Sequence, residues 1–500
     1  ASYSTYKASI FKKQLTADEY SRIAERLYQY EGFYGQKRSL RIYPDSIAAH
    51  VLGYIGEVNR RDIERDSFYK SGDFVGISGL EKQYERELRG IRGQEVLLVD
   101  VHNTIQGKFD GGKLDVNAVA GRNLLSTIDL ELQKYGERLM HNKKGSIVAI
   151  EPRTGEVLCL ISSPTYDPNL LVGVKRGYNY KMLAENDSLE PLFNRALMAK
   201  YPPGSIFKIV QSLIALQDHS ITENTSFQCN KSLVGCHNHP NAQNLREAIQ
   251  MSCNPYFHQV FKRLINQGKS NNYFEDSAIG LGKWSPSVEA FGLGKRLALD
   301  LPNLKAGSVP NVELYDRIYG QRRWAFSTIY SVSIGQGEVE VIPLQMANLA
   351  AIIANRGYYI DPHLVKAVYG DRDSVVNMDK HFVGIDKPYF EPIVDAMNWV
   401  VEKPGGTARR ARIDSITVCG KTGTAENPHG EDHSVFIAFA PMEAPQIAIV
   451  VYVENAGFGG TWAAPIASLM IEKYIKGIIS DSLKENRILE ANLLNVEVEN

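Results

Sequence analysis

The sequence of 500 residues lacks three features that would each assign it to a class. No apolar run reaches the roughly 18 residues that a membrane-spanning helix needs. Only 5 cysteines are present, too few for a disulfide scaffold in a chain of this length. Lys and Arg total 56 against 57 Asp and Glu, a net charge of -1, so nucleic acid is not an expected partner.

What remains is a globular composition, 44% hydrophobic and 23% charged, long enough for more than one domain. We predict an elongated, mixed α+β N-terminal pedestal over residues 1–122, which includes a short charged helix over 79–90. We assign residues 123–485 to a second domain and 486–500 to a tail.

The second domain is predicted to be α+β. Apolar runs at 145–152 and 155–164 form a hairpin, and three more strands are expected between 415 and 454. A mostly helical region, about 190–365, separates the two sets, and a helix over 461–478 can cover them. Strands at both ends of a domain indicate one antiparallel sheet, flanked by helices, with an inserted helical lobe.

One pair of residues has the chemistry of an activated nucleophile. The segment Tyr201-Pro202-Pro203-Gly204 cannot be helical, and an apolar helix is predicted to begin at Ser205. Ser205 and Lys208 then share a helix face, with the serine at the positive end of the helix dipole. Apolar surroundings favour an uncharged lysine, which can take the proton of the serine.

Two further motifs carry polar groups. Ser252-Cys253-Asn254 lies between two helical patterns, and Lys421-Thr422-Gly423-Thr424 lies on a predicted strand. Each of the three motifs alone has an ordinary interpretation, such as a solvated helix face, a helix cap or a strand with an exposed lysine. Similar triplets and quartets also begin at Ser4, Ser67, Lys70 and Ser270.

Together and in this order, the three motifs resemble those of the penicillin-binding protein and serine β-lactamase superfamily. The chain is most similar to class B penicillin-binding proteins of the elongation type, the penicillin-binding protein 2 branch. The resemblance runs from about residue 40 to 478. Further segments that carry it are Gly76-Ile77-Ser78-Gly79-Leu80-Glu81, Asn194-Arg195-Ala196, Gly335-Gln336-Gly337 and Gly405-Gly406-Thr407-Ala408.

The resemblance implies a peptidoglycan D,D-transpeptidase that works through a serine acyl-enzyme. Ser205 would attack the D-Ala-D-Ala carbonyl with Lys208 as general base, and Ser252 would pass the proton to the departing D-alanine. Asn254 would hold the substrate amide and Lys208, and Lys421 would attract the terminal carboxylate and, as a nearby cation, help to keep Lys208 uncharged.

The same resemblance assigns substrate binding to Thr422, Gly423 and Thr424. The backbone N–H groups of Ser205 and Thr424 would form the oxyanion hole. β-Lactams would acylate Ser205 by mimicking the first step. Catalysis would need no cofactor.

Three of the cysteines are close in sequence to two histidines. Cys229, Cys236, His239 and Cys253 offer three thiolates and one imidazole, a donor set that suits structural zinc. A disulfide between Cys229 and Cys236 and free thiols are the two alternatives. Cys159 lies in a strand pattern and is expected to be a small core residue.

Two other functions fit the same motifs. One is a D,D-carboxypeptidase or β-lactamase, in which water replaces the acceptor amine; the other is a non-enzymatic β-lactam sensor or scaffold of the elongation complex. The resemblance implies as partners peptidoglycan stem peptides, β-lactam antibiotics, a membrane glycan polymerase and other elongation-complex proteins. It places the protein at the periplasmic face of the bacterial inner membrane, with the membrane anchor absent from this chain.

Overall fold

The computed structural model describes residues 11–494, except 13–14, 16, 34, 36–39, 102–104, 370–377 and 429. The chain forms two compact units. The first contains the described residues up to Leu125, the segment Tyr166–Asp187 and a short piece at Val368. The second contains Ser126–Thr165, Ser188–Ala367 and the described residues after 377.

The first unit is built from short elements. Antiparallel pairs join β1 (Ile55–Glu57) with β2 (Phe74–Gly76) and β3 (Leu97–Val99) with β4 (Ile105–Lys108). The other elements with most or all of their residues here are α1 (Ala17–Ala24), η1 (Leu27–Gln29), α2 (Ala49–Leu52), α3 (Arg60–Arg65), α4 (Gly79–Gln83), α5 (Glu85–Leu88), η2 (Phe109–Gly112), β5 (Leu124–Ser126), η3 (Pro168–Leu171) and α7 (Arg176–Ala184).

Two details of this unit differ from the sequence prediction. The helix expected over 79–90 is broken at Tyr84 into α4 and α5. The segment Tyr166–Asp187, placed by sequence in the second domain, belongs to the first unit. Its Asn169 side chain donates to the carbonyl of Tyr43 at 2.8 Å and accepts from the Tyr43 amide at 3.0 Å, a long-range pairing without a local sequence signal.

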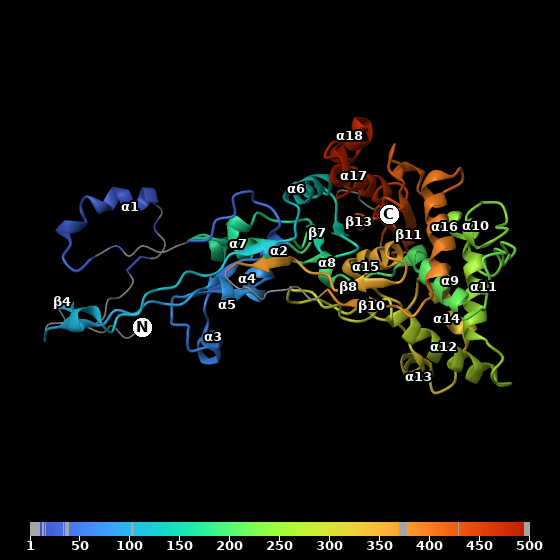
Figure 1. Cartoon of the computed structure of the whole chain (residues 1–500), viewed down its shortest axis with the longest axis horizontal. Helices are drawn as coiled ribbons and strands as arrows, with labels where there is room; N and C mark the ends of the chain where they lie inside the picture. The colour runs from blue at the N-terminus through green and yellow to red at the C-terminus, as the bar shows by residue number, and fades with distance from the viewer. Residues whose placement is uncertain are drawn as a thin grey trace. The chain divides into compact units, whose positions relative to one another are not determined.

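The core of the second unit is one five-stranded antiparallel sheet, as predicted (Figure 1). Its order is β11 (Cys419–Ala425), β12 (His433–Ala440), β13 (Ile447–Val453), β6 (Gly145–Ile150) and β7 (Val157–Ser163). The central strands β12, β13 and β6 are buried along nearly their whole length because helices cover both faces of the sheet. Helices α6 (Leu130–Leu139) and α17 (Ala463–Lys476) lie on one face, and α8 (Arg195–Met198) and α15 (Pro343–Ala354) on the other.

A helical lobe is inserted between β7 and β11, which confirms the predicted fold class. Its helices are η4 (Gly204–Ile206), α9 (Phe207–Gln217), α10 (Leu245–Gln250), α11 (Asn254–Ile265), α12 (Tyr273–Glu289), α13 (Val312–Tyr319), α14 (Phe326–Ile329), η5 (Tyr330–Ile334), η6 (Lys387–Phe390), α16 (Glu391–Glu402) and η7 (Arg409–Ala411). Short strands β8 (Tyr358–Ile360), β9 (Val365–Val368) and β10 (Lys380–Phe382) complete the insertion.

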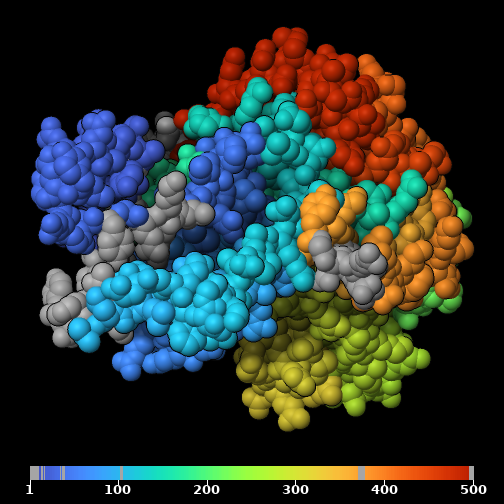
Figure 2. Space-filling model, turned by 60° about the vertical axis from the view of Figure 1, so that its left-hand side comes forward, coloured from blue at the N-terminus to red at the C-terminus, as the bar shows by residue number. Residues whose placement is uncertain are grey.

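The end of the chain corrects one predicted boundary. A tail was expected from residue 486, but α18 (Ser482–Glu490) is a helix that packs against α6 and α17. Figure 2 shows these red C-terminal helices against the teal segment that opens the second unit. Ile488 is fully buried there, and residues 495–500 lie outside the described part. Among the described helices, none combines the length and the apolar character needed to cross a membrane.

Candidate active site

Ser205 lies in η4, directly before the buried helix α9. Every residue of α9 from Phe207 to Leu216 is buried, because the helix runs through the middle of the lobe. Lys208 is therefore fully buried one turn after Ser205. Ser205 Oγ makes no hydrogen bond with any residue that the structure describes, and it faces the cleft described below.

The Ser252-Cys253-Asn254 motif forms the turn between α10 and α11 and meets Lys208 directly. Lys208 Nζ donates to Asn254 Oδ1 at 2.5 Å and to the carbonyl of Ser252 at 2.8 Å, and it lies 3.2 Å from Ser252 Oγ. Ser252 has a left-handed backbone, with φ of 55°. Such a conformation in a non-glycine residue costs about 1–3 kcal/mol and is common at functional sites.

Lys421 lies on β11, at the edge of the sheet, and completes the contact between the motifs. Its Nζ donates to Ser252 Oγ at 2.9 Å and to the carbonyl of Thr422 at 3.0 Å. The structure thus brings together the three motifs found in the sequence, with the Ser252 hydroxyl between two lysine amines. Lys421 is separated from Ser252 by 169 residues, so only the fold creates this contact.

β11 also packs closely against the turn that carries Ser205. A Cβ on Gly204 would lie 2.5 Å from the carbonyl oxygen of Thr424, so only glycine fits there. A Cβ on Gly423 would lie 3.1 Å from the carbonyl oxygen of Pro203. The backbone of Thr424 therefore lies beside Ser205. The backbone N–H groups of these two residues are the expected donors of the oxyanion hole, which must lie close together.

The electrostatics of the two lysines correct one expectation. Burial lowers the pKa of Lys208 to about 7, from a usual value of 10.5. We had expected burial in the apolar helix to have this effect, with the Lys421 cation adding to it, but Lys421 is equally buried. Its own pKa is lowered well below the usual value by burial, and further by the charge of Lys208. Both amines therefore favour the uncharged form, and desolvation is the main cause.

A cleft of about 700 Å³ runs past these residues. Its wall contains Ser205, Ser252, Asn254, Thr422 and Thr424. Because β11 is an edge strand among the described residues, an extended peptide can pair with it while a peptide carbonyl lies at Ser205. This arrangement suits acyl transfer to serine.

Some residues at the cleft had no function assigned to them by the sequence analysis. Thr407 Oγ1 lies 2.7 Å from Thr422 Oγ1, and Gln336 Nε2 donates to the carbonyl of Thr424 at 3.3 Å. Arg409 and Arg410 also line the cleft. Thr407 and Gln336 lie in segments that we had noted only as family-like, and no local feature of the sequence identifies the two arginines.

The repeated copies of the motifs lie elsewhere. Ser67 and Lys70 are in the first unit, and Ser270 Oγ donates to Glu275 at the start of α12. The copy at Ser4 lies outside the described residues. In the described part, only the motifs at Ser205, Ser252 and Lys421 come together, with Ser205, Ser252 and Thr422 in the wall of one cleft.

The predicted metal ligands also converge. One ligand atom from each of Cys229, Cys236, His239 and Cys253 lies within 4.8 Å of all the others. His239 Nε2 is 3.2 Å from Cys236 Sγ and 3.6 Å from Cys229 Sγ. All 5 cysteines are free thiols in this structure. Three sulfur donors and one imidazole match the ligand set of a structural zinc site.

This cluster touches the catalytic motif. Asn254 Nδ2 donates to the carbonyl of Gly235 at 2.7 Å, and the Asn254 backbone N–H donates to Cys236 Sγ at 3.4 Å. The loop that carries the cysteine cluster therefore holds the Asn254 side chain, whose Oδ1 accepts a hydrogen bond from Lys208.

Comparison with known families agrees with this geometry. The sequence profile of the penicillin binding protein transpeptidase domain matches residues 145–472. The profile of the penicillin-binding protein dimerisation domain matches residues 1–125.

Individual relatives match most of the chain. Peptidoglycan D,D-transpeptidase MrdA of Acinetobacter baumannii is 31% identical over 518 residues, which cover 96% of this chain and 72% of the relative. PBP2 from Helicobacter pylori, solved in a complex with MreC, is 27% identical with a TM-score of 0.77, covering 94% of this chain and 87% of that chain. Penicillin-binding protein A from Mycobacterium tuberculosis, solved as an imipenem acyl-enzyme complex, is 27% identical with a TM-score of 0.63, covering 88% and 94%.

Proposed function

The chain belongs to the penicillin-binding protein transpeptidases, and from this premise we propose how its site performs peptidoglycan D,D-transpeptidation in cell-wall elongation. The observation that carries the proposal is the hydrogen-bonded row Lys208–Ser252–Lys421, whose central Ser252 lines the same cleft as Ser205. A buried, uncharged amine next to a serine is the arrangement that a serine acyl-transfer enzyme requires.

In the first half-reaction, Ser205 Oγ attacks the carbonyl carbon between the two terminal D-alanines of a stem peptide. Uncharged Lys208 takes the hydroxyl proton, and the Ser205 and Thr424 amides stabilise the oxyanion. The C–N bond then breaks, and the proton passes through Ser252 to the amine of the departing D-alanine. Lys421, Thr422 and Thr424 bind the terminal carboxylate.

In the second half-reaction, the amine of another stem peptide attacks the ester of Ser205. A new amide bond forms, the C–O bond breaks, and the serine recovers its proton through the same groups. A β-lactam enters the first half-reaction in the same way and leaves its acyl group on Ser205.

An acyl-acceptor assay separates this function from its rivals. With a D-Ala-D-Ala-type thioester donor and a D-amino acid acceptor, we expect an aminolysis product that grows with acceptor concentration. Hydrolysis alone would indicate a carboxypeptidase, and rapid turnover of penicillin would indicate a β-lactamase. Acylation by penicillin without turnover of any donor would favour the sensor or scaffold.

We also propose that the first unit is an interaction platform for elongation-complex proteins, including a membrane glycan polymerase. The β3–β4 pair exposes apolar side chains, with Leu98 48% and Ile105 62% exposed. The similar H. pylori protein was solved with MreC, which supports a partner of that kind. We also propose that the protein acts at the periplasmic face of the inner membrane, where its peptidoglycan substrate would be cross-linked.

We further propose that Cys229, Cys236, His239 and Cys253 hold one structural zinc ion. When bound, zinc would add stability to a loop with few buried apolar residues. None of the catalytic steps above passes through the metal.

Elemental analysis of the purified chain is expected to give one zinc per protein. Cys236→Ser should remove most of it and lower the melting temperature, whereas Cys159→Ser, a buried cysteine outside the cluster, should retain the metal. A zinc-free protein with a mapped Cys229–Cys236 disulfide would contradict the proposal.

A further inference from the structure

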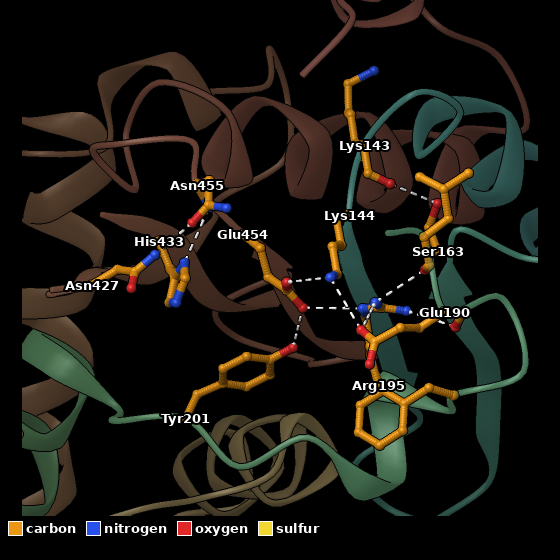
Figure 3. A network of polar contacts seen from close by, with 12 residues as sticks. Lys143, Lys144, Ser163, Glu190, Arg195, Tyr201, Asn427, His433, Glu454 and Asn455 are labelled. Atoms are coloured by element: carbon orange, nitrogen blue, oxygen red, sulfur yellow. Dashed lines mark hydrogen bonds and ion pairs between the residues drawn. The ribbon is translucent and has the colours of Figure 1, made fainter. Parts of the chain in front are cut away.

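A partly buried polar cluster surrounds Glu454, next to Tyr201 (Figure 3). Glu454 follows β13, and its Oε1 accepts hydrogen bonds from the Tyr201 hydroxyl at 2.6 Å and from Arg195 Nε at 3.1 Å. We infer that Glu454 is a positioning residue for Ser205, acting through the Tyr201 hydroxyl. This inference rests on the proposed role of Ser205 as the nucleophile.

The carboxylate of Glu454 is itself held in place. The Arg195 side chain is 1% exposed and also pairs with Glu190 at 3.0 Å. Lys144, just before β6, lies 3.1 Å from Glu190 Oε2 and 3.8 Å from Glu454 Oε2. Two cations and two carboxylates thus balance one another, and charge-assisted hydrogen bonds fix the acceptor that Tyr201 uses.

Tyr201 is held on its other sides by contacts that do not involve its hydroxyl. Its ring stacks on Tyr452 with centroids 3.9 Å apart and contacts His433 at 5.9 Å. Its backbone N–H and carbonyl both pair with Val341, at 2.9 and 2.8 Å. Removing the hydroxyl therefore leaves the ring in its packed site but without the hydrogen bond to Glu454 that fixes its position there.

The chain between Tyr201 and Ser205 is stiff. Pro202 and Pro203 have fixed φ angles and no N–H to form other hydrogen bonds. Gly204 donates to the carbonyl of Gly335 at 2.9 Å and lies against Thr424. A shift at Tyr201 is consequently passed on to Ser205. Rates of reactions between positioned groups fall steeply with displacements of an ångström or less.

Neither Glu454 nor Tyr201 is part of the cleft wall in the described structure. A loss of positioning should therefore slow the acylation step and leave the initial binding of the drug unchanged. A merely stabilising role would lower the melting temperature without this selective effect. The two roles can be separated by measuring both steps.

The test is stopped-flow acylation by benzylpenicillin, which yields the dissociation constant of the first complex and the acylation rate constant. Tyr201→Phe should lower the rate constant about tenfold with an unchanged dissociation constant. Glu454→Asp, which withdraws the carboxylate from Tyr201, should give a similar loss. The double variant should be no slower than the slower single variant, because both remove one interaction.

The matched control is Tyr69→Phe, which removes a hydroxyl that donates to Glu85 at 2.8 Å in the first unit, and it should acylate like the parent. Parental acylation by Tyr201→Phe, or multiplied losses in the double variant, would overturn the inference. If Tyr201→Phe does not fold, Glu454→Asp tests the inference alone. It should lower the acylation rate constant and leave the dissociation constant unchanged. A parent chain that is not acylated at all would instead refute the proposed function.

Discussion

Ser205→Ala is expected to abolish the covalent adduct with benzylpenicillin. In intact-mass spectra, the parent chain should gain the mass of one penicillin and the variant should gain none. The reason is that the ester requires the Ser205 hydroxyl, the serine oxygen that faces the cleft at the start of α9. This is the largest effect expected of any single substitution, because the acceptor atom of the acyl group is removed.

A second serine serves as the control for Ser205. Ser287→Ala removes an exposed hydroxyl of α12 that donates to the carbonyl of Lys283 at 3.1 Å, and it should leave the adduct intact. An adduct that persists in Ser205→Ala and maps to another residue would contradict the assignment of the nucleophile.

Lys208→Met is expected to lower the acylation rate constant about 1000-fold. Methionine fills a similar volume but cannot accept a proton, and general base catalysis typically contributes about 100- to 10,000-fold. The chain should remain folded, since an apolar side chain suits the fully buried position of Lys208. Stopped-flow acylation and a melting curve on the same preparation test both statements.

The control for Lys208 is Lys262→Met, at an exposed position of α11, which should acylate at the parental rate. An acylation rate within a few-fold of the parent in Lys208→Met would show that another group removes the serine proton. Loss of folding in this variant alone would show that the amine is required for structure.

The sequence predicted the sheet, the inserted lobe and the three motifs because each has a local signal. Strands β6 and β13 are continuous apolar runs, and Ser205 follows two prolines and a glycine that exclude helix. The order of the motifs then singled out the copies that come together in the structure, rather than those at Ser67 and Ser270.

Other features depend on contacts that sequence patterns do not contain. Tyr201 opens the Tyr201-Pro202-Pro203-Gly204 segment noted in the sequence, but no sequence pattern pairs it with Glu454, 253 residues away. The direction of the Lys208 pKa shift and its main cause, burial in the apolar helix, could be predicted, but the burial of Lys421 only becomes evident in the fold. The helix at the end of the chain was missed because α18 has a strongly polar composition.

The pH dependence of acylation tests the central claim most directly, because the claim is that an uncharged Lys208 activates Ser205. The proton on Lys208 must leave before the amine can act, so the acylation rate constant should rise with pH and level off above an apparent pKa of about 7. Below that value it should fall about tenfold per pH unit, and this limb should be absent in Lys208→Met. A rate constant that is flat between pH 5.5 and 8.5, or a limb that persists in Lys208→Met, would contradict the account.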